Sequence, residues 1–170
     1  MSAIQVIVLC VAALAGAIDI RHHRIPNWLT LGSACVALAY HAVSGGSGGL
    51  IVATLGWFLG AAAFFLPFAL GGLGAGDVKL VAALGAWLGP GDALWLALFT
   101  GVAGGLLALG FSLARGYLRE AIGNLWLLLT HWRIAGVHML PEMTLQHGRG
   151  PRLAYGVAIF AGTVVTVWMR

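Results

Sequence analysis

The run Leu50–Leu70, L-I-V-A-T-L-G-W-F-L-G-A-A-A-F-F-L-P-F-A-L, contains no charged residue. A helix needs about 20 consecutive apolar residues to cross the hydrocarbon core of a bilayer. This run is therefore long enough for one crossing. The whole chain has a similar character, because 61% of its 170 residues are hydrophobic and only 8% are charged.

That composition excludes several classes of protein. A soluble domain normally carries about a quarter charged residues, and nine Lys and Arg with five Asp and Glu cannot cover the surface of a water-soluble globule of this size. A cytosolic enzyme, a disordered protein and a secreted disulfide scaffold are all disfavoured, and Cys10 and Cys35 form no C-x-x-C pair. We predict an all-α, polytopic membrane bundle that forms a single domain over residues 1–170, with membrane lipid and no nucleic acid among its partners.

Turn signals between the apolar runs predict about six transmembrane helices. Pro26 separates the first two runs, and S-G-G-S-G-G at 44–49 is expected to be a flexible connector before the third. The fourth run is short and is expected to lie deep in the bundle. A cleaved signal peptide is disfavoured for the first run because no basic residue precedes Arg21. The predicted spans are 3–18, 27–43, 50–70, 78–88, 92–113 and 153–169.

The more polar stretch 115–152 predicts an amphipathic helix lying in the headgroup region, with Trp126 and Trp132 as interfacial anchors. A seventh crossing is the alternative, but it would place Arg119 and Arg133 at or near the hydrocarbon. By contrast, the small residues of the fifth run are interpreted as a surface for close helix packing. They are Gly101, Gly104, Gly105 and Ala108.

The positions of the basic residues predict the orientation. With six spans, the connections at 20–27, 71–77 and 114–152, together with Lys79 at the start of the fourth span, hold eight of the nine Lys and Arg. Loops biased in this way face the cytoplasm. We therefore expect the N-terminus outside and these three connections inside.

Two of the five carboxylates stand out by position. Asp92 follows a Pro-Gly turn and is expected to cap the fifth span, whereas Glu120 and Glu142 are expected to be solvated. Asp19 and Asp77 lie at the cytoplasmic ends of apolar helices, where ionisable groups are costly and usually functional. If the first and fourth spans pack together, these two carboxylates become neighbours that share one proton, as in an aspartic protease.

Glycines surround the second of these carboxylates in the run 71–77, G-G-L-G-A-G-D. Their lack of side chains would let an extended substrate backbone approach Asp77. Helix polarity also suggests different roles for the two acids. Asp77 begins a helix, whose N-terminus favours the anion, whereas Asp19 ends one. We therefore expect Asp77 to be the ionised base and Asp19 the neutral acid.

Three motifs together resemble the prepilin peptidase family of membrane aspartic proteases. They are Asp19 followed by I-P-N at 25–27, G-A-G-D-V-K-L at 74–80, and Y-G-V-A-I at 155–159. Ala154 stands where a Pro is frequent in the family. Because the paired C-x-x-C motifs of larger members are absent from this sequence, the resemblance is to the short, peptidase-only type that serves Flp (tight-adherence) pili.

This resemblance implies that Asp19 and Asp77 are the catalytic pair. No metal or other cofactor is expected, because His131, His138 and His147 lack a recognised ligand spacing. The substrate would be a prepilin or pseudopilin whose basic leader is removed at the cytoplasmic face of the bacterial inner membrane. A proton- or ion-coupled transporter and an assembly scaffold are the alternatives. The residues implied to bind substrate or shape the loops are Ile25, Pro26, Asn27, Gly74, Gly76, Lys79, Tyr155 and Gly156.

Overall fold

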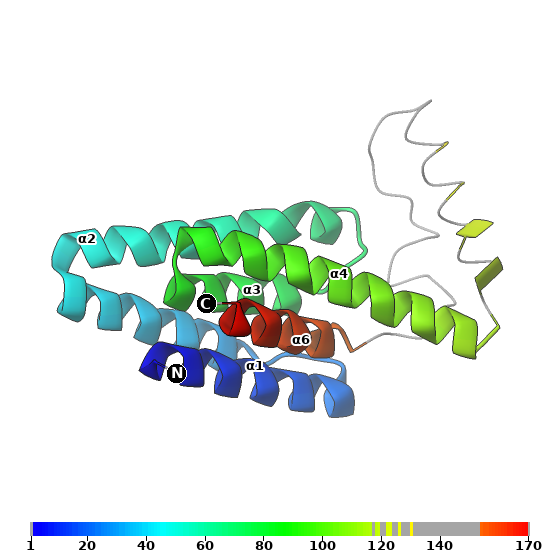
Figure 1. Ribbon diagram of the computed structural model, residues 1–170, viewed down its shortest axis with the longest axis horizontal. Helices are drawn as coiled ribbons and strands as arrows, with labels where there is room; N and C mark the ends of the chain where they lie inside the picture. Colours follow the sequence, from blue (N-terminus) through cyan, green and yellow to red (C-terminus); the bar gives the residue numbers. More distant parts are fainter. Residues whose placement is uncertain are drawn as a thin grey trace.

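The computed structural model describes residues 2–116 and 154–169, together with 118, 119, 122, 123, 126 and 130. Five helices are named within this part of the chain, and together they form the bundle drawn in Figure 1. The predicted all-helical class is confirmed, whereas most of the interfacial helix predicted over 115–152 lies outside the described residues. The helices are α1 (Ala3–His22), α2 (Asn27–Ala69), α3 (Ala75–Leu88), α4 (Pro90–Ala114) and α6 (Tyr155–Trp168).

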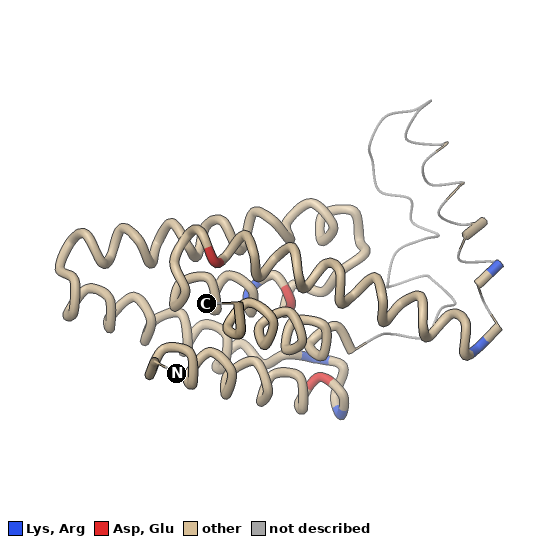
Figure 2. Tube along the Cα trace, in the orientation of Figure 1, with Lys and Arg blue, Asp and Glu red and all other residues tan. Residues whose placement is uncertain are grey.

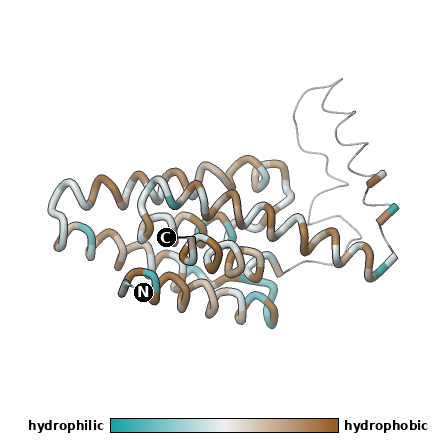
Figure 3. Tube along the Cα trace, in the orientation of Figure 1, coloured by the Kyte–Doolittle hydropathy of each residue, from teal (hydrophilic) through white to brown (hydrophobic). Residues whose placement is uncertain are grey.

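Three of these helices, α1, α2 and α4, are long and apolar enough to cross a membrane. Large apolar side chains on their surfaces are exposed, and Trp28, Phe58 and Leu106 are each more than 60% accessible. Figure 2 shows few charged residues along the helices, with Lys and Arg gathered mostly where α1 and α4 end. Figure 3 shows mostly apolar residues along the helices, with hydrophilic residues more frequent where α1 and α4 end. Such extensive apolar surface suits contact with lipid.

α2 is a hairpin of two helical limbs, 27–45 and 47–69, which run antiparallel in Figure 1. The reversal lies at Gly46, whose φ of 60° and ψ of −145° are outside the helical region. Glycine adopts this positive φ without steric cost. The predicted flexible connector at 44–49 is therefore wrong, because helix continues to both sides of a single reversing residue. The two limbs match the predicted runs 27–43 and 50–70.

α3 is the central helix of the bundle. It contacts α1, α2, α4 and α6, and every residue from Leu80 to Trp87 is buried. The expectation that this short apolar run lies deep in the bundle is confirmed. At its C-terminal end, Trp87 Nε1 donates a hydrogen bond of 3.0 Å to Ser33 Oγ, and His41 Nε2 lies 3.2 Å from the Trp87 carbonyl oxygen. These contacts attach that end of α3 to the first limb of α2.

Glycines allow α3 to pack directly against the second limb of α2. A Cβ atom at Gly60 would lie 2.7 Å from the Val81 carbonyl oxygen. A Cβ atom at Gly56 would meet the carbonyl oxygen of Gly85, and one at Gly85 would meet that of Gly56. Small residues are the usual means by which helices in membranes approach closely. The two helix backbones are thus in contact at this interface.

Asp92 does not cap α4 as the sequence suggested. The cap position is Gly89, with φ of 85°, and Pro90 is the first residue of the helix. Asp92 therefore falls within the first turn, where its side chain is buried. Proline suits the first position of a helix because its missing N–H has no partner there in any case. The helix consequently begins two residues earlier than predicted.

The contact between α2 and α3 predicts the effect of adding side chains to it. Gly60→Val would place branched carbons against the α3 backbone, and overpacking of this kind costs about 3 kcal/mol. Gly110→Val is the matched control, because a Cβ atom there has open space around it. Unfolding in detergent should show a clear loss of stability for the first variant only. Equal stability of the two variants would contradict the packing described here.

Candidate active site

Two buried carboxylates come together from α1 and α3. Asp19 lies in the last turn of α1 and is 6% exposed, and Asp77 lies in the first turn of α3 and is 9% exposed. The contact between α1 and α3, which the prediction from antiparallel crossings requires, is present in the structure, and the charge of Asp19 contributes to the electrostatic environment of Asp77. Burying two acids beside each other is costly unless hydrogen bonds or a shared proton compensate.

Asp19 is held by the start of α6. The Gly156 N–H donates a hydrogen bond of 2.8 Å to Asp19 Oδ2, and Gly156 is the second residue of that helix. N–H groups in the first turn of a helix have no partner within the helix and carry partial positive charge. A Cβ atom at position 156 would lie 2.9 Å from Asp19 Cβ. Glycine at this position therefore leaves room for the carboxylate and presents its N–H to it.

Asp77 is held by the start of its own helix. The Gly74 N–H donates a hydrogen bond of 3.1 Å to Asp77 Oδ2, and the Asp77 N–H donates one of 3.1 Å to the Gly74 carbonyl oxygen. Each carboxylate thus accepts a hydrogen bond from an N–H at a helix N-terminus. At Asp19 the N-terminus of α6 opposes the C-terminus of α1, so helix polarity favours a neutral Asp19 less clearly than the sequence suggested, and the assignment of the ionised acid stays a prediction.

The I-P-N motif packs against the turn that carries Asp77. A Cβ atom at Gly76 would lie 3.1 Å from Ile25 Cβ, which shows how closely the two segments approach. Lys79 Nζ donates a hydrogen bond of 3.0 Å to Asn27 Oδ1 across the same contact. Pro26, in an extended conformation, occupies the N-cap position of α2. The connection between α1 and α2 is thereby attached to the first turn of α3.

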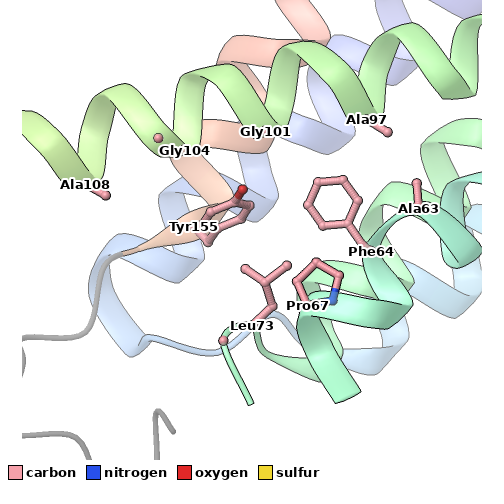
Figure 4. Close-up of a pocket in the computed structure, with 11 residues that line it drawn as sticks. Ala63, Phe64, Pro67, Leu73, Ala97, Gly101, Gly104, Ala108 and Tyr155 are labelled. Carbon is pink, nitrogen blue, oxygen red and sulfur yellow. The ribbon is translucent and has the colours of Figure 1, made fainter. Parts of the chain in front are cut away.

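Tyr155 lies between the acidic pair and an open pocket. Its phenol interacts electrostatically with Asp77, and its ring centroid lies 6.1 Å from that of Phe64. The ring also packs against Gly104, where a Cβ atom would collide with it. Figure 4 shows Tyr155 and Phe64 beside each other below α4, with Leu73 beneath them. The I-P-N, G-x-G-D and Y-G motifs are thus brought to one end of the bundle.

The pocket has a volume of about 550 Å³, and its lining is almost entirely apolar. The sequence interpretation of α4 as a packing surface holds for Gly104 but not for Gly101 and Gly105, where a Cβ atom would meet open space. Phe64 was missed because nothing in an apolar run distinguishes one Phe from its neighbours. The lining residues are Ala63, Phe64, Pro67, Gly72, Leu73, Ala97, Gly101, Gly104, Gly105, Ala108 and Tyr155.

Comparison with known proteins gives one family. The chain matches the type IV leader peptidase family over residues 6–109, which include both aspartates and more than half of the sequence. No curated protein and no solved structure matches it. The match favours a peptidase over the transporter and the scaffold considered from the sequence. The chain belongs to the type IV leader peptidase family and is a prepilin peptidase, an aspartic endopeptidase with membrane helices.

Proposed function

We propose that Asp19 and Asp77 are the catalytic pair and that the chain removes the basic leader from a Flp-type prepilin. The observation that carries this proposal is the meeting of two buried carboxylates from α1 and α3 in a bundle with few other charges. The three motifs that resemble the short members of the family support the Flp-type substrate. A pseudopilin has the same leader chemistry and is included in the proposal.

The reaction follows from two acids that share one proton. The ionised carboxylate takes a proton from a water molecule, and the neutral one donates a hydrogen bond to the scissile carbonyl oxygen. The water oxygen then attacks the carbonyl carbon, and a proton passes to the leaving amine as the peptide bond breaks. Each Oδ2 atom accepts a backbone hydrogen bond. We therefore assign the water and the substrate carbonyl to the Oδ1 atoms.

We propose six crossings, formed by α1, both limbs of α2, α3, α4 and α6, within one domain over residues 1–170. The interfacial helix over 115–152 is part of the same proposal. The positive-inside rule places the ends of α1 and α4 in the cytoplasm, with the N-terminus outside the bacterial inner membrane. The described basic residues that support this orientation are Arg21, Arg24, Lys79, Arg115 and Arg119.

Replacing either acid should abolish cleavage. Asp19→Asn and Asp77→Asn each remove an ionisable group, and general acid–base catalysis contributes about 10²–10⁴-fold. Incubation in lipid vesicles with a Flp-type prepilin that carries its leader should show at least a ~100-fold loss of product. Asp92→Asn, which alters a buried acid in the first turn of α4, is the control and should retain cleavage. Full activity of either pair variant would refute the assignment.

Displacing Asp19 should be nearly as damaging as replacing it. In Gly156→Ala the new Cβ atom would lie 2.9 Å from Asp19 Cβ, so the carboxylate must move. A misplacement of about 1 Å in a catalytic site can cost ~100-fold in rate. Gly91→Ala is the matched control, because Gly91 is also the second residue of a helix and has open space around it. A Gly156→Ala enzyme as active as the control would contradict the proposed role of Asp19.

Labelling tests the orientation. In a background with Cys10→Ser and Cys35→Ser, single cysteines are introduced as His22→Cys and Gly48→Cys, both at exposed positions. A membrane-impermeant maleimide added to spheroplasts should react with the cysteine at 48. The cysteine at 22 should react only after the membrane is permeabilised. The reverse pattern would place the acidic pair on the outer face.

A further inference from the structure

The apolar pocket borders the two segments that hold the acidic pair. Gly72 and Leu73 line it, and they belong to the same turn as Gly74, which binds Asp77. Tyr155 lines it from the other side and precedes Gly156, which binds Asp19. Two segments that position the carboxylates therefore also form the wall of the pocket. Neither aspartate lines the pocket, but a molecule seated in it would have one end at the segments that hold the two acids.

The opposite wall of the pocket is a face of α4 that lacks large side chains. A Cβ atom at Gly101 or Gly105 would meet nothing within 4 Å, although both residues lie within a long apolar helix. In membranes, surfaces of small residues allow a second helix to approach a backbone closely. The wall formed by α2 is different, because Phe64 and Pro67 are bulky. Figure 4 shows these two walls facing each other.

We infer that this pocket binds the first apolar side chains that follow the scissile bond of the substrate. The inference rests on the proposed function, because it takes the substrate to be a prepilin whose hydrophobic helix begins just after the cut. Such a helix would lie along Gly101 and Gly105 of α4, with its N-terminal end at Asp19 and Asp77. A volume of about 550 Å³ is in the range of pockets that bind a small ligand, so it holds a few side chains and not a whole helix.

The pocket therefore selects side chains by size. Phe64 and Tyr155 form the inner end of the pocket. The tyrosine ring packs so closely against Gly104 that no larger residue fits at position 104. Toward the open side, Gly101 and Gly105 leave the space into which apolar side chains fit. Lipid chains reach the same surface, but a lipid would not make cleavage depend on the residues that follow the cut.

Gly105→Leu tests the inference by filling the pocket from α4. The change leaves the packing of the chain intact, because the position faces open space. Gly110→Leu is the matched control on the same helix, and it also faces open space but does not line the pocket. With a Flp-type prepilin in phosphatidylethanolamine–phosphatidylglycerol vesicles, Gly105→Leu should raise KM by at least tenfold, with little change in kcat. Effects of this size are usual when a few methylene groups no longer fit a hydrophobic pocket.

A second prepilin completes the test. In it, the bulky apolar residues of the first two turns after the cut are replaced by alanine. Gly105→Leu should cleave this substrate with a KM within about threefold of wild type, since the smaller side chains restore the fit.

The inference is overturned if Gly105→Leu and Gly110→Leu process the natural prepilin equally well. Lipid chains, and not substrate side chains, would then occupy the pocket. It is also overturned if the alanine substrate does not restore the KM of Gly105→Leu. Failure of the proposed function is distinguishable, because the wild-type chain would then cleave neither prepilin.

Discussion

The structure depends on how two acidic side chains are accommodated in an apolar bundle. An unpaired buried carboxylate costs several kcal/mol or more. Backbone N–H groups at the starts of α3 and α6 supply hydrogen bonds to the two acids, from Gly74 to Asp77 and from Gly156 to Asp19. A helix N-terminus suits this role because its first N–H groups have no partner within the helix. The fold therefore has to bring two helix starts to one place.

Glycine makes that convergence possible in several parts of the bundle. Gly156 admits Asp19 beside the α6 backbone, Gly76 admits Ile25 beside α3, and Gly60 admits the α3 backbone beside α2. In each case a Cβ atom would stand within about 3 Å of the neighbouring segment. Association of helices in lipid relies on close packing because the hydrophobic effect contributes little there. The same residue type thus serves both the packing of the helices and the geometry of the site.

Much of this arrangement could be predicted from the sequence because apolar length and charge position are strong signals. The helical class, the deep position of α3 and the contact between the helices that carry Asp19 and Asp77 all followed from them. The reversal at Gly46 did not, since a run of Gly and Ser is equally compatible with a loop. The hydrogen bond from the Gly156 N–H at the start of α6 to Asp19 was also not predicted. Although the Y-G motif was identified in the sequence, no local pattern indicates from which distant N–H group a carboxylate will accept a hydrogen bond.

The length of α3 has a consequence for the depth of the acidic pair. Its 14 residues extend about 21 Å at 1.5 Å per residue, whereas the hydrocarbon core is about 30 Å thick. Because α3 is enclosed by the other helices, the bilayer meets those helices and not α3, so a short α3 does not have to reach both membrane surfaces. The acids at its start would then lie in a recess that the surrounding helices enclose. Hydration can reach a peptide bond there, while the rest of the substrate remains at its normal depth.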